Sequence, residues 1–359
     1  MCIFCMKKQR IYIPANLPGR ANMADEYKVV DMMKVPNPNP KPNPNKYNFS
    51  NFGCFAADQD SMHTFCVKTD VKSDERNSVS KVCYYESCST SSVIGSVQVN
   101  VGHGNTMALT NNYIYLPVSY DHTILRLARK NVTKSIEKKI PDLYKLVTPS
   151  GGEATNERIK SITYMGANKK FILRLKKGDA VFVKTENGNV SKDTIEYERF
   201  CYATVDSTNK TFLMGEEFLV PHKVNSISAN TQDMHYNSKN GLFLPRPYKI
   251  PQTKEGNLVG NQILQVDIRA GKETMVLKGL RIELNKEENK ISVDVSRKVY
   301  QPKKVIVMDR KVTEFSRYEI EAVSFTTDNY LLYGGNFRKA GQNSDTDKIK
   351  KIANMKFTL

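Results

Sequence analysis

The chain has no tryptophan, only five histidines in 359 residues, and no long uninterrupted apolar run. A helix that crosses a membrane needs about 20 mostly apolar residues in a row, so we expect no membrane span and a soluble protein. Hydrophobic residues still make up 40% of the chain, and its aromatic side chains come from 18 tyrosines and 15 phenylalanines. That content is enough for a sizeable core.

Signatures of catalysis and metal binding are missing as well. The sequence holds no G-x-S-x-G elbow, no H-E-x-x-H pair and no Walker A loop. No two histidines stand at i, i+2 or i, i+4, the spacings that place two ligands on one metal ion. We therefore predict a protein that is not an enzyme, with no catalytic residues, no metal site and no cofactor. The histidines are His63, His103, His122, His222 and His235.

The cysteines do not form a disulfide framework. There are seven of them, an odd number, without regular spacing, and Cys2 and Cys5 make a single C-x-x-C with no second pair. The first 22 residues lack the apolar stretch of a signal peptide, and Met23 offers a second start, so residues 1–22 are interpreted as an upstream extension. We expect synthesis in a reducing cytoplasm, with any release following a route that needs no signal peptide.

Positive charge is in excess. The 54 Lys and Arg residues against 37 Asp and Glu residues give a net charge of +17. Such a surface attracts nucleic acid or an anionic polymer, or serves solubility alone. Because the basic residues are scattered along the whole chain, the partner stays undetermined: a protein, an anionic polymer and a nucleic acid remain open.

A proline-rich segment divides the chain. Residues 35–47, "VPNPNPKPNPNKY", alternate proline with polar residues and predict an extended spacer that cannot pair inside a sheet. It separates a loose head, residues 1–34, from the main body at 48–359. We expect residues 1–46, the head and the spacer together, to be dispensable for folding.

The main body alternates apolar and polar residues almost throughout, which predicts half-buried antiparallel strands. One hairpin pattern recurs: an apolar or small residue, a polar turn, and an apolar anchor nine positions on. It appears in "ITYMGANKKF", "ATVDSTNKTF", "MHYNSKNGLF" and "AVSFTTDNYLL", with "MALTNNYIY" as a shorter relative. Another hairpin is predicted in "GLRIELNKEENKISVDV". The fold class is therefore all-β.

Irregular spacing between these hairpins excludes a strict solenoid and favours a β-propeller, whose blades are small sheets of about four strands. We predict five blades, with a range of five to seven, and place each repeated hairpin in the inner strand pair of one blade. "FGCFAADQD" and the segment after it supply a further blade, which the C-terminal strand is predicted to join. A large β-sandwich or two stacked β-domains is the structural alternative.

Two segments carry a family resemblance. "SISANTQDMHYNSKNGLFLPRPYKIPQTKEGNLVGNQILQVDI" and "SRYEIEAVSFTTDNYLLYGGNFRKAGQNSDTDKIKKI" resemble the last two blades of the helveticin J family of bacteriocin-related proteins. "GHGNTMALTNNYIYLPVSYDHTILRLAR" resembles an earlier blade. The resemblance covers roughly 48–359 and implies a propeller with an antimicrobial role. It supplies no active-site residues, and the head and the spacer are not part of it.

Residues just before the inner strands of a propeller converge at one mouth of its channel. In this chain they form a mixed polar set that suits a sugar or a cation, or plain rim polarity filled by water. The predicted binding residues are His103, Asn105, Lys160, Gln232, Asp233, Glu319 and Glu321.

The sequence thus predicts a non-enzymatic propeller that works by binding, and the resemblance to the helveticin J family implies a relation to bacteriocins. Two alternatives stay open. One is a basic cytoplasmic scaffold or ribonucleoprotein component that binds nucleic acid or a protein. The other is a propeller hydrolase or lactonase that acts at the channel mouth.

Overall fold

The structure is a computed structural model. It describes residues 27–38, 47–58, 61–70, 78–136, 141–175, 182–184, 190–192, 197–224, 227–228, 231–249, 258–283, 291–308, 310–311 and 314–357. The regular secondary structure of these residues is β-strand apart from one short helix, α1 (Arg129–Thr133). No helix within it is long and apolar enough to cross a membrane.

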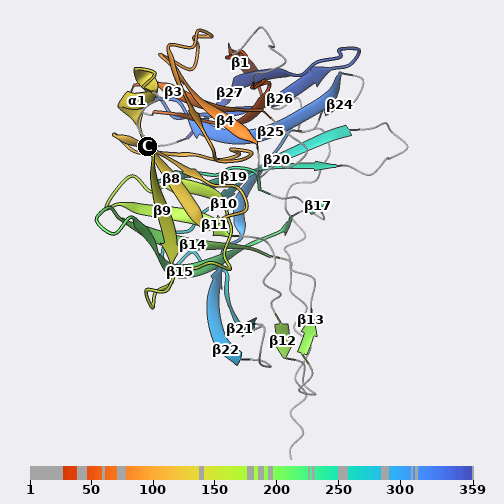
Figure 1. Cartoon of the computed structure of the whole chain (residues 1–359). Coiled ribbons are helices and arrows are strands. Elements are labelled where there is room, and N and C mark those ends of the chain that lie inside the picture. The colour runs from red at the N-terminus through yellow and green to blue at the C-terminus, as the bar shows by residue number, and fades with distance from the viewer. Residues whose placement is uncertain are drawn as a thin grey trace, which may run out of the picture.

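Five four-stranded antiparallel units make up the body (Figure 1). The first holds β2 (Asn51–Ala57), β3 (Thr64–Asp70), β4 (Val79–Tyr85) and β5 (Gly95–Val99). The second holds β6 (Ala108–Leu109), β7 (Tyr113–Pro117), β8 (Thr123–Ala128) and β9 (Asp142–Val147). The third holds β10 (Ile159–Tyr164), β11 (Lys170–Leu175), β14 (Tyr197–Asp206) and β15 (Thr211–Pro221). The fourth holds β18 (His235–Asn237), β19 (Gly241–Lys249), β20 (Leu258–Val266) and β23 (Pro302–Val307), with β24 (Arg310–Lys311) beside β20. The fifth holds β25 (Phe315–Phe325), β26 (Tyr330–Lys339), β27 (Thr346–Lys356) and β1 (Val29–Lys34).

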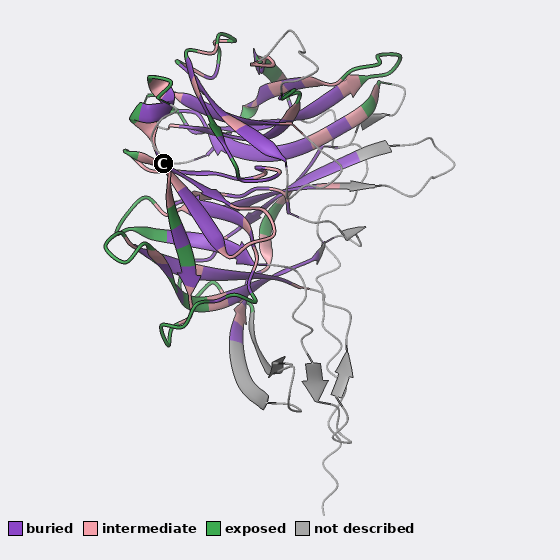
Figure 2. Ribbon diagram, viewed as in Figure 1, coloured by how far each residue is buried: buried purple, intermediate pink, exposed green. Residues whose placement is uncertain are grey.

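These units are the blades of one closed ring. The hydrophobic core is divided among the interfaces between neighbours: Tyr115 of the second blade packs with Phe171 of the third, and Phe243 of the fourth packs in the cluster of Tyr333 of the fifth. Further clusters join the third blade to the fourth, and the first blade to both the second and the fifth. Buried strands therefore run through every blade, while exposed residues gather at turns (Figure 2). The protein is a β-propeller, and the prediction of five blades is confirmed.

Stacking explains why the chain repeats one hairpin. A single four-stranded sheet leaves two faces in water, whereas blades around an axis bury those faces against each other. Four of the five repeated hairpins are inner strand pairs, namely β6–β7, β10–β11, β18–β19 and β25–β26. The fifth, β14–β15, is the outer pair of the third blade, so that part of the prediction was wrong: its anchor Phe212 lies in the same blade as Phe171.

The ring closes differently from the prediction. The C-terminal strand β27 pairs with β26 and with β1, not with the blade that contains "FGCFAADQD". The head is therefore not loose over Val29–Lys34: Met33 is buried in the core, and Asp31 forms ion pairs with Lys348 and Lys350. A six-residue strand before the proline-rich segment completes the last blade, which shifts the domain start from 48 to the head. Residues 1–26 and 39–46, the rest of the predicted head and most of the spacer, lie outside the described residues.

Two insertions form a four-stranded extension, which joins the third blade through a parallel pairing with β15 at Phe218 and Leu219. β12 (Phe182–Lys184) and β13 (Val190–Lys192) leave the third blade between β11 and β14, and β21 (Met275–Glu283) and β22 (Ile291–Val299) leave the fourth between β20 and β23. The β21–β22 hairpin was predicted and is confirmed, and β12 pairs with β21. In Figure 1 these strands extend below the ring. A two-strand hairpin, β16 (Lys223–Val224) and β17 (Ile227–Ser228), follows β15.

Candidate functional site: cavities at the two ends of the channel

Single-residue bulges mark three of the innermost strands. The pairing register shifts at Gly53 in β2, at Lys160 in β10 and at Glu321 in β25. A bulge turns one side chain out of the regular alternation and occurs often beside functional sites. At the first of them only glycine fits, since a Cβ atom on Gly53 would lie 2.5 Å from the backbone oxygen of Gly104.

The end of the channel where the inner strands begin holds a small cavity of about 50 Å³. Three of the predicted residues, His103, Asn105 and Lys160, line it together. The side-chain amide of Asn51 lies 3.3 Å from His103 Nε2, and Lys160 Nζ lies 4.8 Å from the centre of the Tyr120 ring. The space suits one or two water molecules, each of which takes about 30 Å³ of liquid volume. This cavity is too small for an organic ligand.

Two more predicted residues, Asp233 and Gln232, form hydrogen bonds with Thr106 and Ser161. Asp233 is buried, and its Oδ1 accepts a hydrogen bond of 2.5 Å from the hydroxyl of Thr106. Burial raises the pKa of Asp233 well above its usual range. Gln232 is half-buried, and its backbone oxygen accepts a hydrogen bond of 2.9 Å from the Ser161 hydroxyl. Neither Asp233 nor Gln232 is among the residues that line this cavity.

Glu319 and Glu321 do not lie before an inner strand, because β25 already begins at Phe315. Glu321 is the bulge residue, buried, with its Oε1 3.1 Å from Asn336 Nδ2, and burial followed by the charge of Glu319 raises its pKa. Glu319 accepts a hydrogen bond of 2.6 Å from Arg317 and is half-exposed. The predicted mouth is therefore divided into a water-sized cavity, buried acids and a rim ion pair. The described residues contain no cluster of three His, Cys, Asp or Glu side chains that could hold a metal ion.

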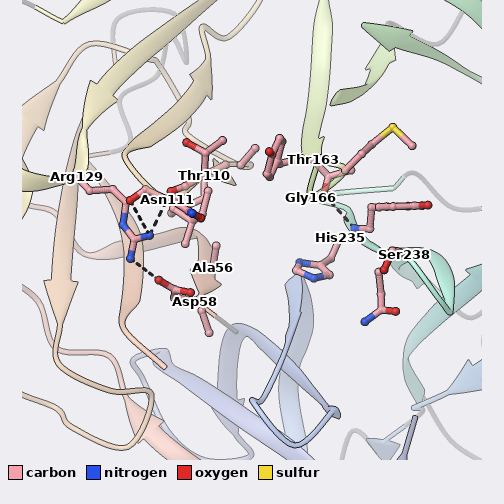
Figure 3. Close-up of a pocket in the computed structure, with 17 residues that line it drawn as sticks. Ala56, Asp58, Thr110, Asn111, Arg129, Thr163, Gly166, His235 and Ser238 are labelled. Atoms are coloured by element: carbon pink, nitrogen blue, oxygen red, sulfur yellow. Dashed lines mark hydrogen bonds and ion pairs between the residues drawn. The ribbon is translucent and has the colours of Figure 1, made fainter. Parts of the chain in front are cut away.

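A larger cavity of about 250 Å³ lies at the other end, where the inner strands finish (Figure 3). The ends of β2, β6, β10 and β18 and the turns after them line it, together with Arg129 from the start of α1. The lining residues are 56–58, 107–111, 129, 163–166 and 235–238. Because it is built by strand ends from four blades, its walls are fixed by the packing of the ring.

One wall of this cavity is a charge-neutral ion pair. Arg129 Nη2 donates to Asp58 Oδ2 at 2.6 Å, and Arg129 Nη1 donates to the backbone oxygen of Thr110 at 3.2 Å. The guanidinium also lies 5.1 Å from the centre of the Phe65 ring. Arg129 is thus fixed by a carboxylate, a carbonyl and an aromatic face, and its charge is balanced by Asp58.

The facing wall carries a neutral histidine. His235 opens β18, its ring centre lies 5.4 Å from that of Phe325, and in Figure 3 its imidazole points into the cavity. Burial lowers the pKa of His235 to about 4. Near neutral pH one ring nitrogen therefore donates and the other accepts. Within the described part of the chain neither nitrogen has a hydrogen-bond partner.

The sequence analysis did not predict this cavity, because it searched for site residues at the wrong ends of the inner strands. The rule used residues that precede each inner strand, whereas the space lies where the strands finish. One signal was present: "HYNSKNG" places His235 directly before a tight polar turn of a repeated hairpin. In the structure β18–β19 is an inner strand pair, so this histidine lies near the channel.

Comparison with known proteins does not assign a family. No family model matches the chain, and no curated protein matches it in sequence. Among solved structures, the tail fiber of Staphylococcus aureus phage P68 is similar at 12% identity and a TM-score of 0.44, over 91% of this chain and 53% of that one. This chain thus spans about half the length of the tail fiber. The β-propeller domain of Myceliophteria thermophila Cps50 (Swd1) is similar at 7% identity and a TM-score of 0.37, over 88% of this chain and 100% of that one.

Proposed function

We propose that this propeller is a binding protein without catalytic activity, and that its ligand occupies the 250 Å³ cavity where the inner strands end. The proposal rests on which polar side chains in the cavity walls are paired with one another and which are not. Arg129 and Asp58 neutralise each other, whereas the imidazole of His235 faces the space with no partner among the described residues. A concave, preformed site with a few placed polar groups is the general form of a ligand site.

Hydrolysis receives less support than binding. Glycoside hydrolysis commonly needs two carboxyl groups on either side of the bond, and Asp58 is the single carboxylate among the residues that line the cavity. Thiol chemistry is also disfavoured, because burial raises the pKa of Cys54 and Cys201, and a thiol reacts as the thiolate. The lactonase and hydrolase alternative therefore ranks below binding.

Arginine placement also weakens the polyanion alternative. Arg174 and Arg246 are buried in ion pairs with Glu198, and Arg126 and Arg338 are paired with Asp142 and Asp345. These side chains are engaged inside the protein or by neighbouring carboxylates and do not present a basic face. A non-enzymatic binding propeller also agrees with what the resemblance to the helveticin J family implies.

Blocking the cavity tests the proposal. Ser238 is exposed, lies on the β18–β19 turn and lines the cavity, so Ser238→Trp should fill the opening without disturbing the core. The probes are glucose, N-acetylglucosamine, glucosamine, glucuronate, glucose 6-phosphate and adenosine monophosphate, each added in a thermal-shift titration. At a concentration of about 100 Kd, a ligand adds about 2.7 kcal/mol of stability to the unsubstituted protein.

The matched control is Ser207→Trp, in the equivalent turn of the similar β14–β15 hairpin, which does not line the cavity. We expect at least one probe to stabilise the unsubstituted protein and the Ser207→Trp variant, and to leave the Ser238→Trp variant unaffected. Equal stabilisation of both variants would place the ligand elsewhere, and no stabilisation by any probe would count against the proposed function.

A further inference from the structure

From the chemistry of the same cavity we infer its ligand class: an uncharged ring that carries several hydroxyl groups, a single neutral monosaccharide unit. This inference rests on the proposed function, because it assumes that the ligand occupies the cavity at the ends of the inner strands. Three features of the walls support it: the charge balance, the kind of hydrogen-bonding groups, and the volume.

Charge balance disfavours an ionic ligand. The charged side chains that line the cavity are Arg129 and Asp58, which are 2.6 Å apart. A phosphate or carboxylate on the ligand would have to compete with Asp58 for the guanidinium, and an ammonium group would have to compete with Arg129. Removing either partner from such a pair leaves a partly buried charge uncompensated, which is unfavourable. A neutral ligand leaves the pair intact.

The remaining polar groups match hydroxyls. The side chains of Asn111 and Ser238 and the hydroxyl of Tyr164 line the cavity and have no hydrogen-bond partner within the part of the chain that the structure describes. Each of these groups, like the neutral imidazole of His235, can both donate and accept. A sugar hydroxyl also does both, so every contact can be made without leaving a donor or acceptor unpaired. Asn111 and His235 lie on opposite sides of the space, which allows them to bind both edges of one ring (Figure 3).

The volume limits the ligand to about one ring. Pockets for drug-sized ligands measure about 300 to 1,000 Å³, and this cavity measures about 250 Å³. Its rim at Ser238 is exposed, so a longer saccharide would place one unit inside and continue outward. We therefore expect recognition of a single unit, either free or at the end of a chain.

The test measures the affinity of the intact chain for glucose and N-acetylglucosamine, and for the charged analogues glucosamine, glucuronate and glucose 6-phosphate, by isothermal titration calorimetry. Two substitutions remove polar groups: Asn111→Ala, and His235→Phe, which keeps a ring against Phe325. Asn112→Ala is the matched control, since Asn112 is the exposed neighbour of Asn111 and does not line the cavity. Circular dichroism of each variant verifies its fold.

We expect a neutral sugar to bind at least tenfold more tightly than its charged analogues. Asn111→Ala and His235→Phe should each weaken that binding about five- to twentyfold, which is the loss of one or two hydrogen bonds, and Asn112→Ala should leave it unchanged. If a charged analogue binds best and Ser238→Trp blocks it, the ligand class is wrong while the proposed function stands. If neutral sugars bind equally well to Asn111→Ala, His235→Phe and the unsubstituted chain, the inference is overturned. If no probe binds in the cavity, both proposals fail.

Discussion

Glu198→Gln should lower the free energy of unfolding by about 3 to 5 kcal/mol, the range for removing one partner of a buried ion pair. Glu198 lies near the start of β14 in the third blade, between two buried arginines. Its Oε1 accepts from Arg174 Nη1 at 2.8 Å, and its Oε2 accepts from Arg246 Nη2 at 2.5 Å. Thr231 adds hydrogen bonds from its backbone N–H at 3.0 Å and its hydroxyl at 2.6 Å. Glutamine keeps the shape but leaves two buried cations without an anion.

The same group predicts a pH dependence. Burial alone would raise the pKa of Glu198, but Arg246, Arg174 and Thr231 together hold it at about 2. Since the pKa of Glu198 is lower in the folded protein than its ordinary value of 4.5, the stabilisation is present above about pH 4.5 and is lost as the pH falls toward 2. It amounts to a contribution on the order of 3 kcal/mol. The Glu198→Gln variant should lack this acid-dependent component.

Urea denaturation of both proteins at pH 7 and at pH 3 measures these effects. Glu153→Gln is the control, because Glu153 forms its ion pair with Lys145 at the exposed surface and surface pairs contribute little. We expect its unfolding midpoint to stay near that of the unsubstituted protein. An unchanged midpoint for Glu198→Gln would show that the two arginines do not depend on this carboxylate.

The second large effect concerns ring closure. A chain that begins at Tyr47 lacks β1, and we expect it to lose on the order of 5 kcal/mol, a large fraction of the 5 to 15 kcal/mol typical of a folded domain. Strand β27 would lose its outer partner and expose an unpaired edge. The side chains of Tyr27, Met33 and Val35, all buried, would be lost from the core, each contributing about 1.5 to 3 kcal/mol.

Complementation separates strand pairing from other effects of the deletion. A peptide of residues 27–35 added to the shortened chain should raise its melting temperature with increasing peptide concentration, as any ligand of the folded state does. A peptide of the same composition in scrambled order should have no effect. A shortened chain that melts at the temperature of the full chain would contradict closure by β1.

The fold was largely predictable from the sequence because strand alternation and polar turns are local signals. "MHYNSKNGLF" and "ITYMGANKKF" each specify a hairpin by themselves. Every blade of a propeller must also bury apolar side chains against its two neighbours, so the same sequence pattern recurs. Closure was not predictable in this way. Strand β1 pairs with β27 across more than 300 residues, and nothing in "VVDMMK" indicates its partner. The proline-rich segment after it also made the head look separate from the body.

The candidate site could be predicted from the sequence only in part. His103, Asn105 and Lys160 do meet, although Lys160 lies within β10 and not before it, and they line a cavity of about 50 Å³. The larger cavity depends on Arg129, which directly follows β8 in the second blade. It also depends on the ion pair between Arg129 and Asp58 of the first blade. Because these residues are 71 positions apart, only the packed ring brings them to one wall. The bulges at Lys160 and Glu321 likewise depend on register, which the sequence pattern does not specify.

A crystal structure of the protein with the monosaccharide that gives the largest thermal shift is the most direct measurement of the central claim. We expect one sugar ring in the cavity, between Asn111 on one side and His235 on the other, with the Arg129–Asp58 pair unbroken. A sugar bound at the opposite end of the channel or on the outer strands, with only water between Asn111 and His235, would contradict it.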